Sequence, residues 1–474
     1  CKYLNEKNIK IKIINSNSFF LKNKKKIINM LIVFNHFLYR LTQYFICNFL
    51  IKFTIPKNRK KIILIDKYIF PNFINNERYY NGLIQNLPKQ SSNNIFFVPT
   101  IVMFKPSELF KVYKCLKKSK KKYIIKEQFY SLKNIYFAIK HFQRKRRLQI
   151  KDYKLLNINI KTLIIEELQN DNLGFFSAVE SFLTVDFIRN LKKNKIKIYK
   201  AIDWFENRAE DKAWNYSFNT YMPEVKTLSY RGMIPSNMLL SEQYTLKIEE
   251  QKGFLANEIG VIGKNLINES RKFNKLSHFI VCPAFRFNHL WLNKKNSIHN
   301  INRENLKILI ALPIVLEDSI KILNLINSIN FNKDYKNIKL YIKSHPTNFN
   351  FIKTYVKKYL SNNFIFVDDP IFKIFKRTNM LISGMSSVSL EGIALNLPVI
   401  IIKSSSTLEY STIPHYIPKN LYKFCNNIEE IKSSIHFFMN KSQKENIKDL
   451  NNSKFFLKNN FQKMNKKNLK EFIN

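Results

Sequence analysis

Residues 380–403 have the sequence MLISGMSSVSLEGIALNLPVIIIK, and their pattern gives the clearest indication of the fold class. The apolar run 380–382 predicts a short buried strand that ends at a Ser-Gly turn. The apolar spacing over 386–396 predicts a helix packed on a sheet. A Leu-Pro pair then directs the chain into a second apolar strand, 399–402. Strand, helix and strand in this order form a βαβ unit, which implies a parallel sheet.

The turn before this helix carries small polar residues. In a βαβ unit the helix begins at the carboxyl edge of the sheet, where unpaired backbone N–H groups and the helix dipole favour an anion. Gly384 lies in the turn, and Ser386 and Ser387 add hydroxyl donors. Glu391, one turn further on, is placed to accept hydrogen bonds from ribose hydroxyls. We expect a nucleoside phosphate here; the alternative is that Ser386 only caps the helix and Glu391 is solvated.

The composition indicates a folded, strongly basic chain. A hydrophobic fraction of 45% over 474 residues is enough for two or three packed domains. The formal charge of +46 is spread over every segment, and abundant Lys, Asn and Ile indicate an AT-rich genome. Because no nucleic-acid-binding motif accompanies the charge, we expect no nucleic acid partner. The five cysteines are far apart and odd in number, which favours a reducing cytoplasmic setting without a metal site.

The most apolar region, 27–53, is interrupted by polar residues. A membrane-spanning helix needs about 20 mostly uncharged residues, so this region predicts an amphipathic helix instead. Basic residues flank it at 24–26 and 57–61, which favours contact with anionic lipid at the inner face of the cell membrane. Burial in a protein core is the alternative. Because the chain begins at Cys1 without a methionine, we expect further residues before it.

A second stretch rich in polar and aromatic residues follows a predicted strand at 196–202. Its sequence is AIDWFENRAEDKAWNYSFNTYMP, and Asp203 and Glu206 come just past the expected strand end. Ligands of open α/β sheets lie at the carboxyl ends of strands, so a general base is expected here. Arg286 follows another strand and is a candidate to clamp a phosphate. Core packing and plain ion pairs are the alternatives.

From residue 307 onward, strands and helices alternate. Strands are predicted at 307–312, 338–343, 364–367, 380–383 and 399–402, which indicates a doubly wound parallel sheet. The sequence Lys343-Ser344-His345-Pro346 follows the second of these strands. If this strand and 380–383 are neighbours, His345 and the serine pair contact the same phosphate. His345 then acts as a general acid or donates a hydrogen bond to the phosphate. The alternative is that His345 has only a structural role in the turn.

These motifs resemble those of known families. The region after residue 301 looks like the nucleotide-binding half of GT-B glycosyltransferases. The pair of Lys343-Ser344-His345-Pro346 with Ser386-Ser387 resembles the His-Pro and serine motifs of capsule sialyltransferases and teichoic-acid glycerophosphate transferases. The stretches DWFENRAEDKAWN, YRGMIPS, CPAFRFNHLW and ALPIVLEDSIKIL resemble surface carbohydrate biosynthesis proteins.

The resemblance implies an α/β GT-B-like fold: two Rossmann-like doubly wound domains with an interdomain cleft. The resemblance implies that His345, Ser386 and Ser387 contact the donor phosphates and that Glu391 contacts the ribose; Arg286, Lys343 and Gly384 join this nucleotide-sugar site by their position at strand ends. The family's catalytic base does not transfer, because Glu210-Asp211 is followed by Lys212 and not by glycine. The catalytic candidates are therefore His345 and, by position alone, Asp203 and Glu206. The expected domains are 1–55, a segment with the amphipathic helix; 56–300, the acceptor domain; 301–440, the nucleotide-sugar domain; and 441–474, a helical tail.

The expected activity is transfer of a sugar from a nucleotide-sugar donor to a surface polysaccharide or lipid-linked glycan acceptor, as in capsule or lipopolysaccharide synthesis. No cofactor and no metal are expected, because the helix dipole and basic groups stabilise the leaving phosphate. A nucleotide-sugar 2-epimerase and a glycerophosphotransferase are alternatives of similar architecture. A non-catalytic membrane-associated scaffold is an alternative of another class.

Overall fold

The computed structural model describes most of the chain. It covers residues 19–56, 61–71, 74, 77, 79–155, 157–170, 172–235, 244–292, 305–331, 338–361, 363–404 and 413–474. The basic flank 57–60 lies outside the described residues. The contacts between residues divide the chain into two compact units. Unit 1 comprises the described residues of Cys1–Glu77, Lys89–Ser229 and Glu249–Asn257, and unit 2 those of Arg78–Pro88, Tyr230–Ile248 and Glu258–Asn474.

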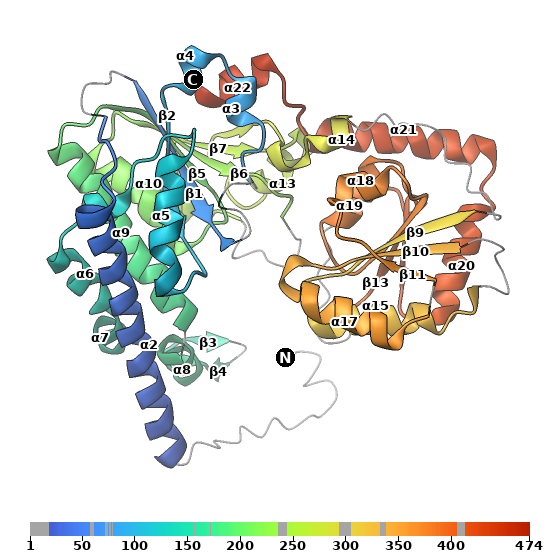
Figure 1. Cartoon of the computed structure of the whole chain (residues 1–474), viewed down its shortest axis with the longest axis horizontal. Helices are drawn as coiled ribbons and strands as arrows, with labels where there is room; N and C mark the ends of the chain where they lie inside the picture. The colour runs from blue at the N-terminus through green and yellow to red at the C-terminus, as the bar shows by residue number, and fades with distance from the viewer. Residues whose placement is uncertain are drawn as a thin grey trace. The chain divides into compact units, whose positions relative to one another are not determined.

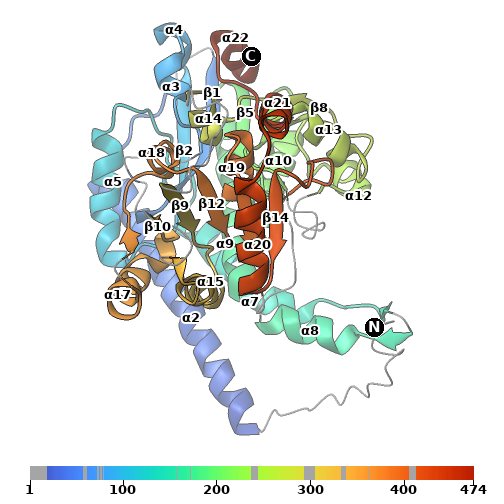
Figure 2. The same cartoon turned by 90° about the vertical axis from the view of Figure 1, so that its right-hand side faces the viewer.

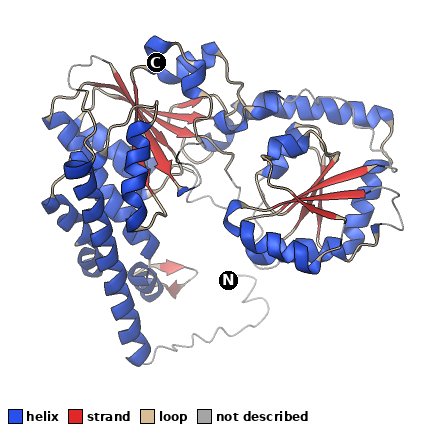
Figure 3. Cartoon of the chain, in the orientation of Figure 1, coloured by secondary structure: helices blue, strands red, loops and turns tan. Residues whose placement is uncertain are grey.

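Two six-stranded sheets form the framework, with helices packed around them (Figure 3). The first sheet has the order β2-β1-β5-β6-β7-β8 and the second β11-β10-β9-β12-β13-β14. Their strands are β1 (Ile62–Ile69), β2 (Ile95–Ile101), β5 (Ile198–Trp204), β6 (Lys226–Arg231), β7 (Glu258–Val261), β8 (Phe279–Val281), β9 (Leu306–Ala311), β10 (Ile338–Lys343), β11 (Phe364–Phe366), β12 (Met380–Ser383), β13 (Val399–Ile402) and β14 (Tyr422–Cys425). The strands β3 (Lys154–Leu155) and β4 (Ile158–Asn159) form a small antiparallel hairpin.

The helices before β9 are α2 (Phe19–Phe45), the π-helix η1 (Ile46–Leu50), α3 (Leu83–Asn86), α4 (Lys89–Ser92), η3 (Pro106–Glu108), α5 (Leu109–Lys118), η4 (Lys126–Gln128), α6 (Leu132–Ile139), α7 (His141–Arg144), η5 (Lys145–Arg147), α8 (Lys161–Asn170), α9 (Asn172–Lys193), α10 (Ala209–Tyr221), α12 (Lys247–Gln251), α13 (Lys264–Arg271), η6 (Phe285–Phe287) and α14 (His289–Leu292). Those after β9 are α15 (Leu316–Asn327), η7 (Pro346–Asn348), α17 (Phe349–Tyr359), α18 (Ile371–Phe375), α19 (Val388–Ala394), α20 (Ile428–Met439), α21 (Gln443–Asn460) and α22 (Lys466–Ile473).

The second sheet is parallel and doubly wound, as predicted. Its chain order, third-second-first-fourth-fifth-sixth, is that of a nucleotide-binding Rossmann sheet. Alternate residues of each strand point to opposite faces. Ile382 and Ile400 join the core formed with α15, α17 and α20, whereas Leu381 and Val399 face Gly392 of α19. Helices therefore cover both faces.

The C-terminal helices extend from the second sheet to strands of the first sheet, all within unit 2 (Figure 1). The N–H of Gln462 donates to Ile262 O at 2.6 Å, and Gln462 O accepts from the N–H of Ala284 at 2.9 Å. Beyond these bonds, Phe472 of α22 packs against Tyr230 and Phe285, with ring centroids 5.3 and 5.0 Å apart. The helices α21 and α22 make up most of the predicted tail, 441–474.

The structure corrects three details of the sequence interpretation. Asp203 lies inside β5, not beyond its end, because the strand continues to Trp204. The helix predicted at 386–396 is only the seven-residue α19, because Ser386 and Ser387 form the turn that precedes it. The strands β10 and β12 are not neighbours, since β9 pairs with both of them.

Helix α2 confirms that the apolar region near the N-terminus is helical. Figure 2 shows its N-terminal half projecting away from the other helices of unit 1. No helix in the described part of the chain is long and apolar enough to span a membrane.

Candidate functional site

The carboxyl edge of the second sheet contains a topological switch point between β9 and β12. At this point the chain order reverses, and ligands of open α/β sheets bind there. Ala311, the last residue of β9, is in register with Lys343 of β10 and with Ser383 of β12. Because neighbouring strands lie about 4.8 Å apart, the ends of β10 and β12 are about 10 Å apart. The two predicted motifs therefore leave the sheet at one level, with β9 between them.

The loop after β9 is held from both sides. Asn348 of η7 donates from Nδ2 to Ile314 O at 2.8 Å. Ser319 of α15 donates from Oγ to Pro313 O at 3.0 Å. On the other side Gly384 lies so close that a Cβ atom there would be 2.9 Å from Pro313 Cγ. The φ angle of Gly384 is not in the left-handed region, so backbone conformation does not require a glycine there. Its missing side chain instead permits close packing of the two loops at the switch point.

His345 is half-buried at the end of β10. Its Nδ1 accepts from the backbone N–H of Thr347 at 3.3 Å and lies 2.8 Å from Thr347 Oγ1. A neutral imidazole carries one ring proton, so an accepting Nδ1 places that proton on Nε2. The ring therefore caps η7 through Nδ1, and its neutral form carries a donor at Nε2.

Lys343 is directed elsewhere. Its Nζ donates to Asp368 O at 2.9 Å and lies 3.6 Å from the Asp368 carboxylate. Asp368 follows β11, on the side of β10 away from the switch point. In this conformation Lys343 therefore joins the loops after β10 and β11 and is not part of the group of residues around β9.

Ser386 and Ser387 are half-buried in the turn between β12 and α19. The Oγ of Ser386 lies 3.5 Å from the N–H of Val388, the long limit of a hydrogen bond. Ser387 makes no side-chain cap bond to the helix. The bond to Ser386 is of the kind that the capping alternative predicts, and a helix as short as α19 adds only a weak dipole.

Glu391 is paired with a residue that was not predicted as part of the site. Its Oε2 lies 2.8 Å from Nε2 of His289, and the two side chains are 12% and 19% exposed. His289 begins α14, close in sequence to Arg286 of η6. Arg286 is half-buried and its guanidinium lies 5.8 Å from the Phe287 ring centroid. The sequence signal for His289 was its position three residues after Arg286, in the loop that follows a strand.

In unit 1, Asp203 belongs to a buried polar network. It is 1% exposed, and Ser229 Oγ donates to its Oδ1 at 2.9 Å. Asn215 of α10 donates from Nδ2 to Ser229 Oγ at 2.9 Å. Burial, together with the nearby Asp211 carboxyl, raises the pKa of Asp203 well above its usual range. The network favours a structural role for Asp203.

Glu206 is more accessible than Asp203. Its side chain is 28% exposed and forms an ion pair with Arg208 at 2.9 Å. The indole Nε1 of Trp204 donates to its Oε1, also at 2.9 Å. Of the two acidic residues predicted as candidate bases, Glu206 is the one that a substrate could reach in this conformation.

A further group of charged residues lies near the switch point of the first sheet, between β1 and β5. Asp66 follows Ile65, which pairs with Ile202, so Asp66 and Asp203 occupy matching positions. Burial raises the pKa of Asp66 to about 7, although Lys126 opposes this shift. Burial disfavours ionisation of Glu180, but Lys126 and Arg40 lower the pKa of Glu180 to about 2. In the sequence KKIILID, residues 60–66, the apolar run predicts a strand that ends at Asp66. The other charged groups come from distant helices, so the sequence does not show that they meet it.

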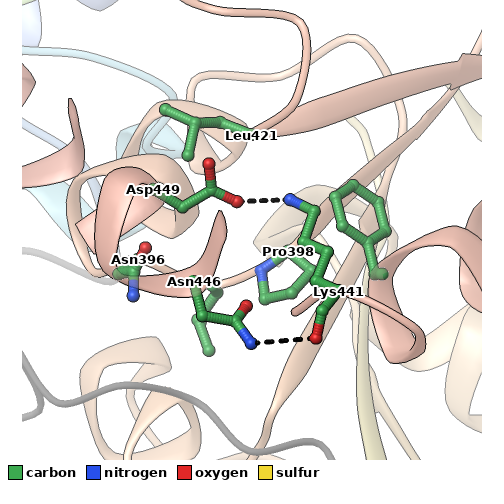
Figure 4. Close-up of a pocket in the computed structure, with 8 residues that line it drawn as sticks. Asn396, Pro398, Leu421, Lys441, Asn446 and Asp449 are labelled. Carbon is green, nitrogen blue, oxygen red and sulfur yellow. Dashed lines mark hydrogen bonds and ion pairs between the residues drawn. The ribbon is translucent and has the colours of Figure 1, made fainter. Parts of the chain in front are cut away.

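Two cavities lie in unit 2 and include none of the predicted site residues. One, of about 20 Å³, is lined by residues around the amino ends of β13 and β14 and has room for about one water molecule (Figure 4). There Lys441 pairs with Asp449, and its backbone oxygen accepts from Asn446. The other has a volume of about 440 Å³. It is lined by residues of α13, of α21 and of the segment just before β14: Asn265, Asn268, Glu269, Tyr416, Ile417, Pro418, Asn452, Phe455 and Phe456.

No protein-family model matches the chain, and no curated protein matches it in sequence. A solved structure of a Listeria monocytogenes protein assigned as a UDP-N-acetylglucosamine 2-epimerase is similar, with a TM-score of 0.50 and 11% identity over 87% of this chain and 95% of that chain. The fold is of the GT-B type. This assignment rests on that similarity and on the two parallel sheets.

Two further GT-B structures are similar to this chain at lower scores. S. aureus MnaA with UDP has a TM-score of 0.48 and 11% identity over 88% of this chain and 95% of that chain. MurG of Acinetobacter baumannii has a TM-score of 0.48 and 8% identity over 88% of this chain and 99% of that chain.

Proposed function

We propose that this protein is a glycosyltransferase that moves a sugar from a nucleotide-sugar donor to a surface polysaccharide or lipid-linked glycan acceptor. One observation carries the proposal: the loops with His345 and with Ser386-Ser387 leave the second sheet in register, on both sides of the β9 end. This is the position where GT-B and other Rossmann-like sheets hold a nucleotide.

The proposed donor site uses the described geometry. The Nε2–H of His345 and the hydroxyls of Ser386 and Ser387 would hold the phosphates, and Gly384 allows the backbone to approach them. Glu391 would accept hydrogen bonds from the ribose hydroxyls through its carboxylate. These donors would stabilise the charge on the leaving phosphate during transfer, so we expect EDTA to leave the rate unchanged.

For the catalytic base we favour Glu206 over Asp203. A base must reach the acceptor hydroxyl within hydrogen-bond distance. Asp203 is buried and accepts from Ser229, whereas Glu206 is partly exposed. Replacement of Glu206 by Gln should lower the rate of transfer without loss of nucleotide affinity.

A nucleotide-sugar 2-epimerase is the second candidate, because the similar Listeria monocytogenes protein is assigned that activity. An epimerase needs no acceptor, so incubation with donor alone separates the two. Appearance of an epimer without acceptor would favour the epimerase. Release of free nucleotide only when a glycan acceptor is present would favour the transferase.

The first experiment is a thermal-shift screen of the full chain with UDP, CMP, CDP and GDP. A ligand at 100 times its Kd stabilises the folded state by about 2.7 kcal/mol. We expect one nucleotide to raise the Tm clearly more than the others. A Tm that responds to none of the four contradicts both enzymes and favours a non-catalytic scaffold.

A further inference from the structure

The helix α2 exposes apolar side chains along one side. Ile27, Leu31, Phe34, Leu38, Phe45 and Phe49 are between 42% and 64% exposed. Their spacing of four, three, four, seven and four residues keeps them on one face of a helix with 3.6 residues per turn. The stripe continues from α2 into η1 and is about 33 Å long at ~1.5 Å per residue.

The opposite face of α2 holds it on unit 1 and includes polar groups. Arg40 is 6% exposed and forms an ion pair with Glu180 of α9 at 2.8 Å. Gln43 is fully buried and donates to Tyr113 Oη of α5 at 3.2 Å. The same inner face packs Val33, Phe37, Leu41 and Tyr44 on the core of unit 1. The helix therefore has one apolar face on the core and a second, exposed apolar stripe, where an ordinary surface helix is polar. Because Arg40 and Gln43 already have partners inside unit 1, the apolar stripe faces outward.

The elements beside the stripe are basic. α6 packs against α2 and exposes Lys133 and the rings of Tyr136 and Phe137, and Lys140, directly after α6, is exposed as well. No Asp or Glu occurs in α2, η1, α6, α7 or η5, whereas Lys and Arg occur in four of these five elements. The acidic residue of η4, which also packs against α2, is the buried Glu127. Lys140 Nζ lies 4.4 Å from the Tyr136 ring centroid. Aromatic and basic side chains beside an apolar stripe match a layer of anionic lipid headgroups over acyl chains.

We propose that unit 1 docks on an anionic membrane surface, with the apolar stripe of α2 inserted among the acyl chains and the basic face of α6 against the headgroups. The occupant is a lipid surface and not a groove-binding segment, because the stripe is convex, long and narrow and is bordered by positive charge. Helix α2 then lies in the plane of the interface, since no described helix can span a membrane. The proposal is independent of the proposed donor site, because it concerns binding alone.

The test is co-sedimentation of the full chain with vesicles of phosphatidylcholine alone and of phosphatidylcholine with phosphatidylglycerol. We expect binding to the anionic vesicles that weakens as salt rises. The double variant L31E/L38E should lower the partition coefficient at least about ten-fold, because each change removes a large apolar side chain from the lipid. Because both side chains are solvent-exposed, the Tm of this variant in the absence of lipid should equal that of the native chain.

The matched control is F351E/Y359E on α17 of unit 2, where the side chains are 50% and 56% exposed. This control should bind vesicles like the native chain, and K133E/K140E should lose binding to anionic vesicles. Equal loss in the control, or no binding of the native chain to either vesicle, would overturn the proposal. A native chain that is dimeric without lipid and becomes monomeric as L31E/L38E would also overturn it, and would assign the stripe to a second copy.

Discussion

The imidazole of His289 in α14 lies 2.8 Å from the Glu391 carboxylate of α19, so the residue proposed to hold the ribose already has a protein partner. A carboxylate has two oxygens and about four acceptor positions. Glu391 can therefore accept from His289 with Oε2 and from a ribose with Oε1. In this arrangement His289 orients Glu391 and does not compete with the nucleotide.

We predict that Glu391→Ala weakens nucleotide binding by about 10- to 100-fold, since it removes charged hydrogen bonds to the ribose. His289→Ala should weaken binding only about three-fold, because the carboxylate remains but is less well oriented. The double variant should bind like Glu391→Ala alone, since residues that act through one another are not additive. Isothermal titration with the nucleotide found in the screen measures all three. Tighter binding by His289→Ala would mean that His289 competes with the ribose.

We predict that His345→Ala and Ser387→Ala each lower the transfer rate about a hundred-fold or more, because each removes a donor to the leaving phosphate. Both side chains are only half-buried, so the folded state should persist, as judged by circular dichroism. His436→Ala and Ser433→Ala, on the exposed side of α20, are the matched controls. Normal turnover in either His345→Ala or Ser387→Ala would rule out the proposed donor site.

Alanine variants of Gly384 and Gly392 probe two close contacts: the one between the loops at the switch point, and the one between α19 and the sheet. At Gly384 an added Cβ would be 2.9 Å from Pro313 Cγ, and at Gly392 it would be 2.7 Å from Leu381 Cδ2. Both alanine variants should lose about 1–3 kcal/mol of unfolding free energy by overpacking. Gly384→Ala should also lose nucleotide affinity because it displaces the loop after β9, and Gly392→Ala should lose affinity because it shifts α19, which carries Glu391. Denaturant unfolding and titration at a temperature where both variants are folded make the comparison. Unchanged affinity in Gly384→Ala would contradict the role of this glycine at the switch point.

The strands of the second sheet could be predicted because local pattern determines them. The ranges 338–343, 380–383 and 399–402 coincide with β10, β12 and β13, since each is a short apolar or alternating run. The strand β14 was missed because Lys423 interrupts its four residues. The alternation of strands and helices then determines a parallel sheet, although the sequence did not show that β9 lies between β10 and β12.

The side-chain partners in the candidate site could not be predicted. Lys343 and Asp368 are 25 residues apart, and His289 and Glu391 are 102 residues apart. Which charged group pairs with which depends on how the loops pack, and that is set by tertiary contacts such as Gly384 against Pro313. The sequence therefore indicates which residues lie at the edge of the sheet, but not which of them are already paired.

Asp66 predicts a pH dependence of stability in unit 1. Burial raises its pKa from 3.8 to about 7 in the folded state. Between these values the folded state keeps a proton that the unfolded state releases, so stability decreases as pH rises from about 4 to about 7. Asp66→Asn removes this term. The stability of the variant relative to the native chain should rise by about 4 kcal/mol across that window and stay constant above it. Urea unfolding at pH 4, 5.5, 7 and 8 measures the difference, and a difference independent of pH contradicts the prediction.

Gly263 tests how the C-terminal segment is attached to unit 2. A Cβ at Gly263 would lie 2.4 Å from the Asn460 Cα and 2.5 Å from its O, and these backbone atoms cannot rotate away. Gly263→Ala should therefore displace the chain at Asn460 and break the neighbouring bond from Gln462 N–H to Ile262 O. We expect a loss of about 3 kcal/mol or more in unfolding free energy.

Hydrogen exchange gives the more specific measurement. Amides of α22 should exchange faster in Gly263→Ala, because the bonds that hold Gln462 lie between α21 and α22. The control is Gly253→Ala, where the nearest atom to a Cβ is 4.0 Å away but φ is +72°. This control should lose only about 1 kcal/mol through backbone strain, with unchanged exchange in α22. If α22 exchanges equally in both variants, the close approach of Gly263 to Asn460 is not what holds the C-terminal segment in place.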